Sequence, residues 1–157
     1  MTPTPHRFDH SGMQILDDGE SLKLLSSVPI GRLVFTKGGL PAVRLVNFVL
    51  DGDTLIFSTA DGDKYRAAER GDVVAFEVDE VDQDRHLGWT VTAVGHLSVI
   101  ESEEAESLRH VLLLRPWAPN RNTYLIRLGI ESLEGRRLAP WAQRPHDQDR
   151  DGLRSGG

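Results

Sequence analysis

Four polar residues near the middle of the chain have the types and spacing of an anion-binding site. Arg44 lies in a Val-rich segment, and Ser58 and Thr59 end the next apolar segment. Lys64 follows after a short turn, at the start of an expected helix. A guanidinium, two hydroxyls, an ammonium and the N-terminal amides of a helix are the donors that a phosphate group needs. The alternative is a set of solvated side chains beside a turn, and the spacing alone favours that second interpretation.

The segments that must position these residues are predicted to form an antiparallel meander. Apolar alternation and Val-rich composition predict strands at residues 31–36, 41–50 and 54–59. A Gly-Gly pair at positions 38–39 and an Asp-Gly pair at 51–52 separate them, and both are hairpin signals. In such a hairpin Asn47 lies close to Phe57, so Arg44, the two hydroxyls and Lys64 should gather at one end.

The rest of the chain predicts a small, mainly β protein. Asp17 with Glu20 three positions later resembles a helix-capping box, and Gly71 closes a short helix over residues 64–69. We also expect a helix from Ser102, loops at residues 79–86 and 115–122, and strands at residues 73–78, 88–100 and 123–133. Hairpin-connected runs of strands argue against parallel βαβ units. We expect about six strands in a small antiparallel barrel, with short helices packed at its ends.

Composition limits the classes of protein that remain. The chain has 157 residues, of which 39% are hydrophobic and 27% charged, and this fits one globular domain. Residues 1–13 and 140–157 have the composition of tails, and the second is predicted to be disordered; the domain then spans residues 14–139. The net charge of −6 disfavours nucleic acid and anionic membranes as partners. No apolar run could span a bilayer, no signal peptide is evident and Cys is absent, so we expect a cytoplasmic protein.

Common motifs that would assign a chemistry are missing. The sequence has no Gly-x-Gly-x-x-Gly, no P-loop, no Gly-x-Ser-x-Gly and no His-Glu-x-x-His. The six His are scattered without metal-ligand spacing, so no metal site is predicted. No side chain stands out as an acid or base, and no catalytic residue is predicted.

Six short motifs follow one another through the first half of the chain. They are Gly31-Arg32-Leu33-Val34, Gly39-x-Pro41, Arg44-x-Val46-Asn47-Phe48, Asp51-Gly52-x-x-Leu55-x-Phe57-x-Thr59, Gly62-x-Lys64 and Val74-Ala75-Phe76-Glu77-Val78. With later elements they make residues 15–138 resemble the pyridoxamine-5′-phosphate oxidase-like flavin proteins. Within that family the chain is most similar to the nitroimidazole-reductase-like branch.

The resemblance implies a six-stranded antiparallel Greek-key split barrel that forms a homodimer, with FMN in a groove between the subunits. It assigns cofactor contacts to seven residues, which are Arg44, Leu45, Val46, Asn47, Ser58, Thr59 and Lys64. The backbone of the first four would face the pyrimidine edge of the flavin. The hydroxyls match the end of the next strand, and the Lys matches the phosphate-binding position. This assignment agrees with the cluster that the spacing predicts.

The chain departs from the family pattern at two of these positions. Leu45 stands where the family often has Pro, and it retains a backbone N–H. Ser58 stands where the nitroimidazole-reductase branch often has His, which argues against that chemistry. Residues 137–140 echo the Arg-Leu-x-Pro ending of the full oxidases, but the substrate-binding elements of those enzymes are not recognisable. Oxidation of pyridoxamine phosphate is therefore not predicted.

Two tryptophans have different expected positions. Trp117 lies between two prolines, after an apolar helix. It could stack beside the flavin or line the dimer groove, or it could close the end of the barrel, and the two interpretations are equally supported. Trp89, which starts a strand, is expected in the core.

Three functional hypotheses remain after these steps. The first is an FMN-binding oxidoreductase that passes electrons from a reduced nicotinamide to a small-molecule acceptor. The second is a deazaflavin-dependent reductase, whose cofactor has a longer and more acidic tail. The third is a non-enzymatic module that binds flavin or haem, or binds neither; for haem, His96 and His110 are the candidate axial ligands.

Overall fold

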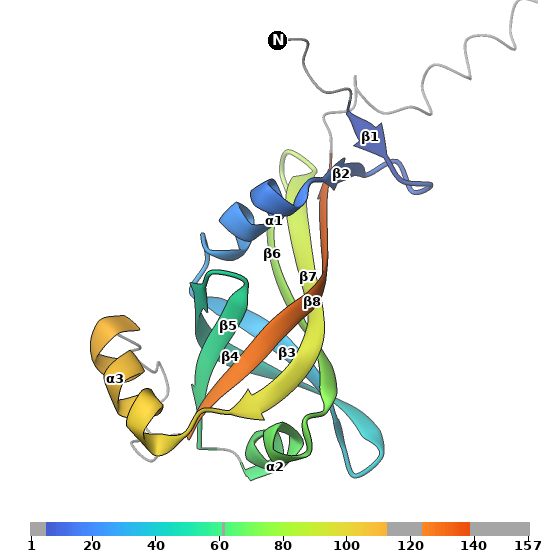
Figure 1. The fold of residues 1–157 in the computed structure, drawn as a ribbon. Helices are drawn as coiled ribbons and strands as arrows, with labels where there is room; N and C mark the ends of the chain where they lie inside the picture. Colours follow the sequence, from blue (N-terminus) through green and yellow to red (C-terminus); the bar gives the residue numbers. More distant parts are fainter. Residues whose placement is uncertain (1–5, 61, 113–123, 139–157) are drawn as a thin grey trace, which may run out of the picture.

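Six antiparallel strands close into a barrel in the computed structural model, which describes residues 6–60, 62–112 and 124–138. The strands are β3 (Ile30–Lys37), β4 (Leu40–Asp51), β5 (Thr54–Thr59), β6 (Val73–Asp82), β7 (Leu87–Val99) and β8 (Tyr124–Leu138). They pair in the order β8-β5-β4-β3-β6-β7, and β7 pairs again with β8 (Figure 1). The expected mainly β, six-stranded antiparallel split barrel is thus confirmed.

Short elements extend and cover this barrel. Two short strands, β1 (Arg7–Phe8) and β2 (Gln14–Leu16), add to the sheet beside β8. The helices are α1 (Asp18–Leu25), α2 (Gly62–Arg70) and α3 (Ser102–Leu112). Helix α2 lies across one end of the barrel, and α3 lies outside its wall (Figure 1). None of the helices in the described part of the chain is long and apolar enough to cross a membrane.

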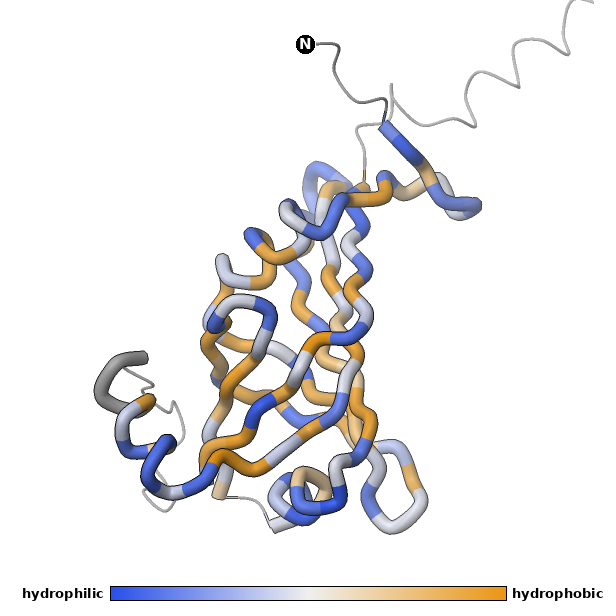
Figure 2. Tube along the Cα trace, viewed as in Figure 1, coloured by the Kyte–Doolittle hydropathy of each residue, from blue (hydrophilic) through white to orange (hydrophobic). Residues whose placement is uncertain are grey.

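The core follows from alternation along the strands. In β3, Leu33 and Phe35 are buried, whereas Arg32 and Val34 face outward. Hydrophobic residues recur along the other strands (Figure 2), and the buried ones join a single core cluster with those of β3. A second, smaller cluster lies under α3, on the outer side of β5 and β8, and its buried members are Ile56, Ile100, Ala105 and Leu125.

The predicted hairpin turns are confirmed by backbone conformation. Gly38 and Gly39 have φ of 56° and 79°, the left-handed values that a type I′ turn requires at both central positions. Gly52 has φ of 63° in the β4–β5 turn. These turns set the register in which Val34 faces Val43.

Two sequence predictions about strand length were wrong. Residues 79–82 were expected in an acidic loop, but β6 continues through Asp82, which pairs with Leu87. Strand β8 likewise extends to Leu138. The long hairpin partner β7 supplies backbone hydrogen bonds to both neighbours, so polar composition does not end the strands there.

Helix α1 begins at the predicted cap and is tied to the barrel by its first turn. The Asp17 side chain accepts a hydrogen bond from the Glu20 N–H at 2.8 Å. The Glu20 carboxylate accepts from Arg137 of β8 at 2.7 Å. The acid three residues after the cap therefore serves a tertiary contact.

Candidate functional site

The barrel opens along one edge of β4. Residues 40–47 pair with β3, and pairing with β5 begins only at Phe48. Within the described residues, no strand bonds to the other edge of this segment, so its outward N–H and C=O groups are available to a ligand. This open edge carries the four consecutive residues to which the sequence analysis assigned flavin contacts.

Side chains on the open edge differ in exposure. Val46 is buried in the barrel, whereas Leu45 is 69% exposed. The Arg44 guanidinium donates to the Val43 carbonyl at 2.9 Å. Asn47 donates from Nδ2 to the Pro29 carbonyl at 3.2 Å.

The Asn47 side chain also leaves one acceptor unused. Its Oδ1 is buried and has no hydrogen-bond partner among the residues that the structure describes. A buried, unsatisfied acceptor is costly, and a ligand N–H would satisfy it. The edge thus fits a planar ring with hydrogen-bonding groups on its rim.

A buried ammonium lies at the end of the barrel that α2 covers. Lys64 is in the first turn of α2 and is 8% exposed, and Thr59, at the end of β5, is 5% exposed. Lys64 Nζ donates to Thr59 Oγ1 at 3.4 Å. Two of the residues predicted to bind phosphate are therefore in contact, beside the N-terminus of a nine-residue helix.

The two predicted hydroxyls lie on opposite faces of β5. Successive strand residues alternate; Phe57 belongs to the barrel core and Ile56 to the cluster under α3. Thr59 shares the side of Phe57, and Ser58 that of Ile56. Thr59 is the hydroxyl that meets Lys64.

An acidic residue next to Lys64 is balanced by two cations. Asp63 forms ion pairs with Lys37 at 3.0 Å and with Arg66 at 2.6 Å. Hydrogen bonds from Lys37, and then from Arg66, hold the pKa of Asp63 below its usual value. These contacts attach the end of β3 to α2 and offset the carboxylate charge near the expected phosphate position.

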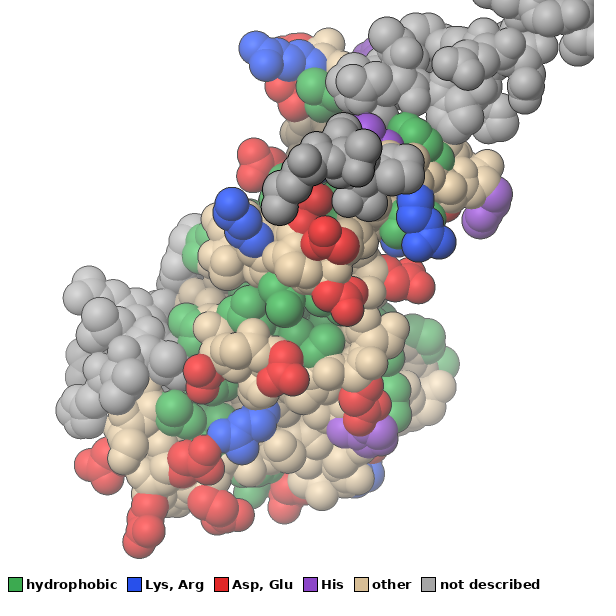
Figure 3. Space-filling model, turned by 45° about the horizontal axis from the view of Figure 1, so that its top comes forward, with side chains coloured by type: hydrophobic (Ala, Val, Ile, Leu, Met, Phe, Trp, Pro, Cys, Tyr) green, Lys and Arg blue, Asp and Glu red, His purple; other side chains and the backbone are tan. Residues whose placement is uncertain are grey.

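Acidic side chains are numerous on the molecular surface. They outnumber basic ones on the face shown in Figure 3 and crowd its lower left, where α3 begins. The whole chain has a net charge of −6. The Lys64 ammonium is therefore a local attraction for an anion on an otherwise acidic molecule.

The outer side of β3, β4 and β6 is apolar and exposed. We call it the apolar outer face, and it consists of Val34, Val43, Leu45 and Val73. Leu45 belongs both to this face and to the open edge of β4. Val34 and Val43 are register partners, so two exposed apolar side chains lie next to each other on this face.

A charged cluster borders the apolar outer face. Arg32 is paired with Leu45 on one side and with Glu77 on the other. Its Nη1 lies 3.1 Å from Glu77 Oε2 and 2.9 Å from Asp79 Oδ2. Burial, and then the neighbouring Asp79, raise the pKa of Glu77 above its usual value.

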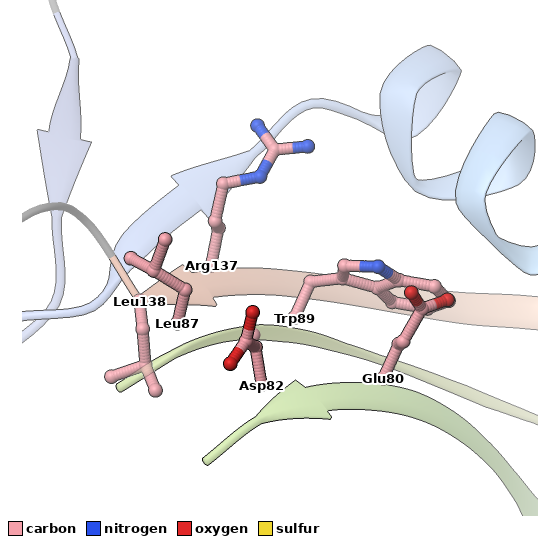
Figure 4. A pocket seen from close by; sticks show the side chains of 7 residues that line it. Glu80, Asp82, Leu87, Trp89, Arg137 and Leu138 are labelled. Carbon is pink, nitrogen blue, oxygen red and sulfur yellow. The ribbon is translucent and has the colours of Figure 1, made fainter. Parts of the chain in front are cut away.

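A pocket of about 350 Å³ lies at the other end of the barrel, by the β6–β7 hairpin. Trp89 lines it and is partly buried against the core, so it is both a packing residue and a wall of this pocket. The Arg137 guanidinium, which binds Glu20, points away from Glu80 and Asp82 (Figure 4). None of its described lining residues is among those predicted to contact a cofactor.

The sequence analysis missed an aromatic pair beside Lys64. Tyr65 and Tyr124 have ring centroids 4.2 Å apart, and they are the two tyrosines of the chain. The adjacency of Tyr65 to Lys64 was the available signal, but the partner comes from β8. Trp117 lies outside the described residues, and its predicted contact with the flavin stays a prediction.

Comparison with known proteins places the chain in a family. The sequence matches the family described as Pyridoxamine 5'-phosphate oxidase over residues 17–137. An uncharacterized protein of Mycobacterium tuberculosis is 34% identical over 135 residues, which cover 83% of this chain and 88% of the relative.

Solved structures agree with this match. The FAD binding protein from Mycobacterium smegmatis is 31% identical with a TM-score of 0.66, and the similarity covers 80% of this chain and 99% of that one. A Corynebacterium diphtheriae protein of unknown function is 30% identical with a TM-score of 0.65, covering 82% and 99% of the two chains. With a family match over most of its length and the six-stranded split barrel, this chain belongs to the pyridoxamine 5'-phosphate oxidase family.

Proposed function

We propose that the protein binds a flavin nucleotide, with the ring along the open edge of β4 and the phosphate at Lys64. The observation that carries this proposal is the unpaired edge of residues 40–47, with a buried ammonium at the same end of the barrel. The FAD that the Mycobacterium smegmatis relative binds is further support.

The residues present suit the parts of such a ligand. Backbone N–H and C=O groups of residues 44–47, together with the unsatisfied Asn47 Oδ1, match the alternating donors and acceptors of a pyrimidine ring. Lys64, Thr59 and the first amides of α2 supply charged and neutral donors to a phosphate. Because Lys64 and Thr59 are buried, these contacts form away from bulk water and are worth more there.

The proposed activity is that of an oxidoreductase. A bound flavin supplies hydride and single-electron transfer. The chain itself would hold the ring at the exposed edge, where a reduced nicotinamide and then a small-molecule acceptor can reach it. No acid or base of this chain is assigned a catalytic role.

We further propose that the protein is a homodimer joined through its apolar outer face. Val34, Val43 and Leu45 lie on neighbouring strands with their side chains on the solvent side. A second copy would cover them and would also close the open edge of β4 into a groove. Leu45 belongs to both the apolar outer face and the open edge of β4. A partner subunit that buries Leu45 would therefore also lie next to the edge proposed to hold the flavin ring.

A ligand titration of the purified protein tests the proposal. FMN, FAD, riboflavin and a deazaflavin cofactor are each followed by absorbance and fluorescence. Saturable binding of FMN or FAD at one per subunit, with weaker binding of riboflavin, is the expected result. Binding of the deazaflavin cofactor alone would support the alternative reductase, and binding of none of the four would refute a flavin site.

Among the described residues, the candidate ligand His96 does not support the haem alternative. His96 is exposed on β7, and its Nδ1 is 2.6 Å from Glu131 Oε1 on β8. This ring is therefore engaged on the outer wall, away from the open edge of β4. The side chain of His110 lies outside the described part of the structure.

A further inference from the structure

A second pocket lies directly beside the proposed phosphate position. It has a volume of about 470 Å³ and is formed where α2, the end of β7, the start of α3 and the start of β8 meet. Tyr65 and Tyr124 form an aromatic wall, and Glu69 and Glu101 contribute carboxylates. The volume lies within the range of ordinary small-molecule sites.

Two connections join this pocket to the Lys64 site. Tyr65 follows Lys64 in α2, and Tyr124 is the register partner of Thr59 across the β5–β8 ladder. Partners in an antiparallel ladder have Cα atoms about 4.5–5.5 Å apart. A molecule with its phosphate at Lys64 and Thr59 therefore needs only a short linker to reach the tyrosines.

The aromatic wall is suited to a planar ring. The Tyr65 and Tyr124 rings lie 4.2 Å apart at 32°, so each restrains the other. Tyr124 is nevertheless 49% exposed and offers a surface for stacking. Nucleic-acid bases stack on such side chains because every base has a π-face.

The charges of the pocket select an uncharged ligand rich in hydroxyls. Glu69, followed by burial, raises the pKa of the Tyr65 hydroxyl, and Glu101 also contributes. These carboxylates would repel a phosphate or an acidic cofactor tail placed inside the pocket, so both phosphates of a dinucleotide would have to lie on its Lys64 side. They can instead accept hydrogen bonds from ribose hydroxyls, as can Ser98 and Ser102 in the same wall.

We propose that the flavin nucleotide is the dinucleotide FAD, with its adenosine half in the pocket formed by Tyr65 and Tyr124. The inference rests on the proposed flavin site at Lys64, and it assigns a role to a tyrosine pair that the mononucleotide would leave unused. The same carboxylates disfavour the acidic tail of a deazaflavin cofactor. The ligand recognised here is thus an adenosine linked through a diphosphate to the flavin.

Affinities of the full chain for FAD and FMN, compared across variants, test this inference. The wild type should bind FAD at least about fivefold more tightly than FMN, from stacking of one base. Tyr124→Leu removes the exposed ring and should weaken the affinity for FAD on the order of 5- to 150-fold. Its affinity for FMN should not change. Tyr124→Phe keeps the aromatic face and should retain most of the FAD affinity.

A second variant tests the ribose contact without altering the aromatic wall. Glu101→Gln keeps the size of the side chain. It should also weaken the affinity for FAD and leave the affinity for FMN unchanged. Thermal unfolding of each variant without ligand shows whether it is folded, and FMN binding provides an internal control.

The outcomes separate this inference from the flavin site itself. Tight FMN binding with no preference for FAD, or an equal loss of both flavins in Tyr124→Leu, would overturn the adenosine pocket and leave the phosphate site standing. Failure of the wild type to bind either flavin would overturn both. We expect Tyr124→Leu and Glu101→Gln to lose affinity for FAD but not for FMN. Tyr124→Phe should keep most of the wild-type affinity for FAD.

Discussion

Replacing Lys64 by Met removes the one charge that the proposed phosphate site depends on. The side chain is 8% exposed at the end of the barrel, and its Nζ lies 3.4 Å from Thr59 Oγ1. Met has a similar length and an apolar stem, so packing against the barrel should be kept. The variant should therefore report the electrostatic contact rather than a packing defect.

The size of the effect follows from the kind of contact. A hydrogen bond to a charged group contributes about 1.5–3 kcal/mol. At about 1.4 kcal/mol for each factor of ten, the Kd for FMN should rise roughly 10- to 150-fold. Riboflavin has the same ring and ribityl chain but no phosphate, and its Kd should not change.

Fluorescence titrations of wild type and Lys64→Met with FMN and riboflavin measure both values. Lys64→Arg retains a positive charge and should lose less affinity. Lys23→Met, on the exposed side of α1, removes an equal charge from a residue outside the proposed site and controls for net charge. An unchanged Kd for FMN, or an equal loss for riboflavin, would show that Lys64 does not bind the phosphate.

Three further predictions concern assembly, pH dependence and local stability. Leu45→Glu places a charge on an exposed residue of the apolar outer face. If the wild type sediments as the proposed dimer, this variant should sediment as a monomer; a dimer that persists would locate the interface elsewhere. Because burial beside Asp79 raises the pKa of Glu77, the folded state holds this proton more tightly than the unfolded chain. Stability should fall as pH rises from the ordinary value of 4.5 through the raised value. Urea midpoints across that range should fall less steeply in Glu77→Gln, and identical slopes would contradict the assignment. Asp17→Ala removes the cap that accepts from the Glu20 N–H and should lower the free energy of unfolding by about 0.5–2 kcal/mol; a loss within error in urea unfolding would mean that tertiary contacts alone hold α1.

The sequence by itself determined most of the strands and turns. Strand β5 has the bounds that the sequence predicts, residues 54–59, and the Gly-Gly pair adopts the left-handed conformations expected of its turn. Both signals are local, since alternation decides which face is buried and Gly permits positive φ at little cost. The contact between Thr59 and Lys64 was also within reach, because a strand end and the following helix are joined by a short turn.

Other features were decided only by tertiary structure. Strand β8 enters between β5 and β7, and this pairing brings Tyr124 to Tyr65 and Arg137 to Glu20. The open edge of β4 likewise depends on where β5 stops pairing with it. Barrel closure joins segments that are far apart in the chain, and the backbone hydrogen bonds that select these partners carry no side-chain signature. The contact between Thr59 and Lys64 could therefore be predicted from local spacing, whereas the aromatic pocket beside it and the edge proposed to hold the flavin ring emerged only when the barrel closed.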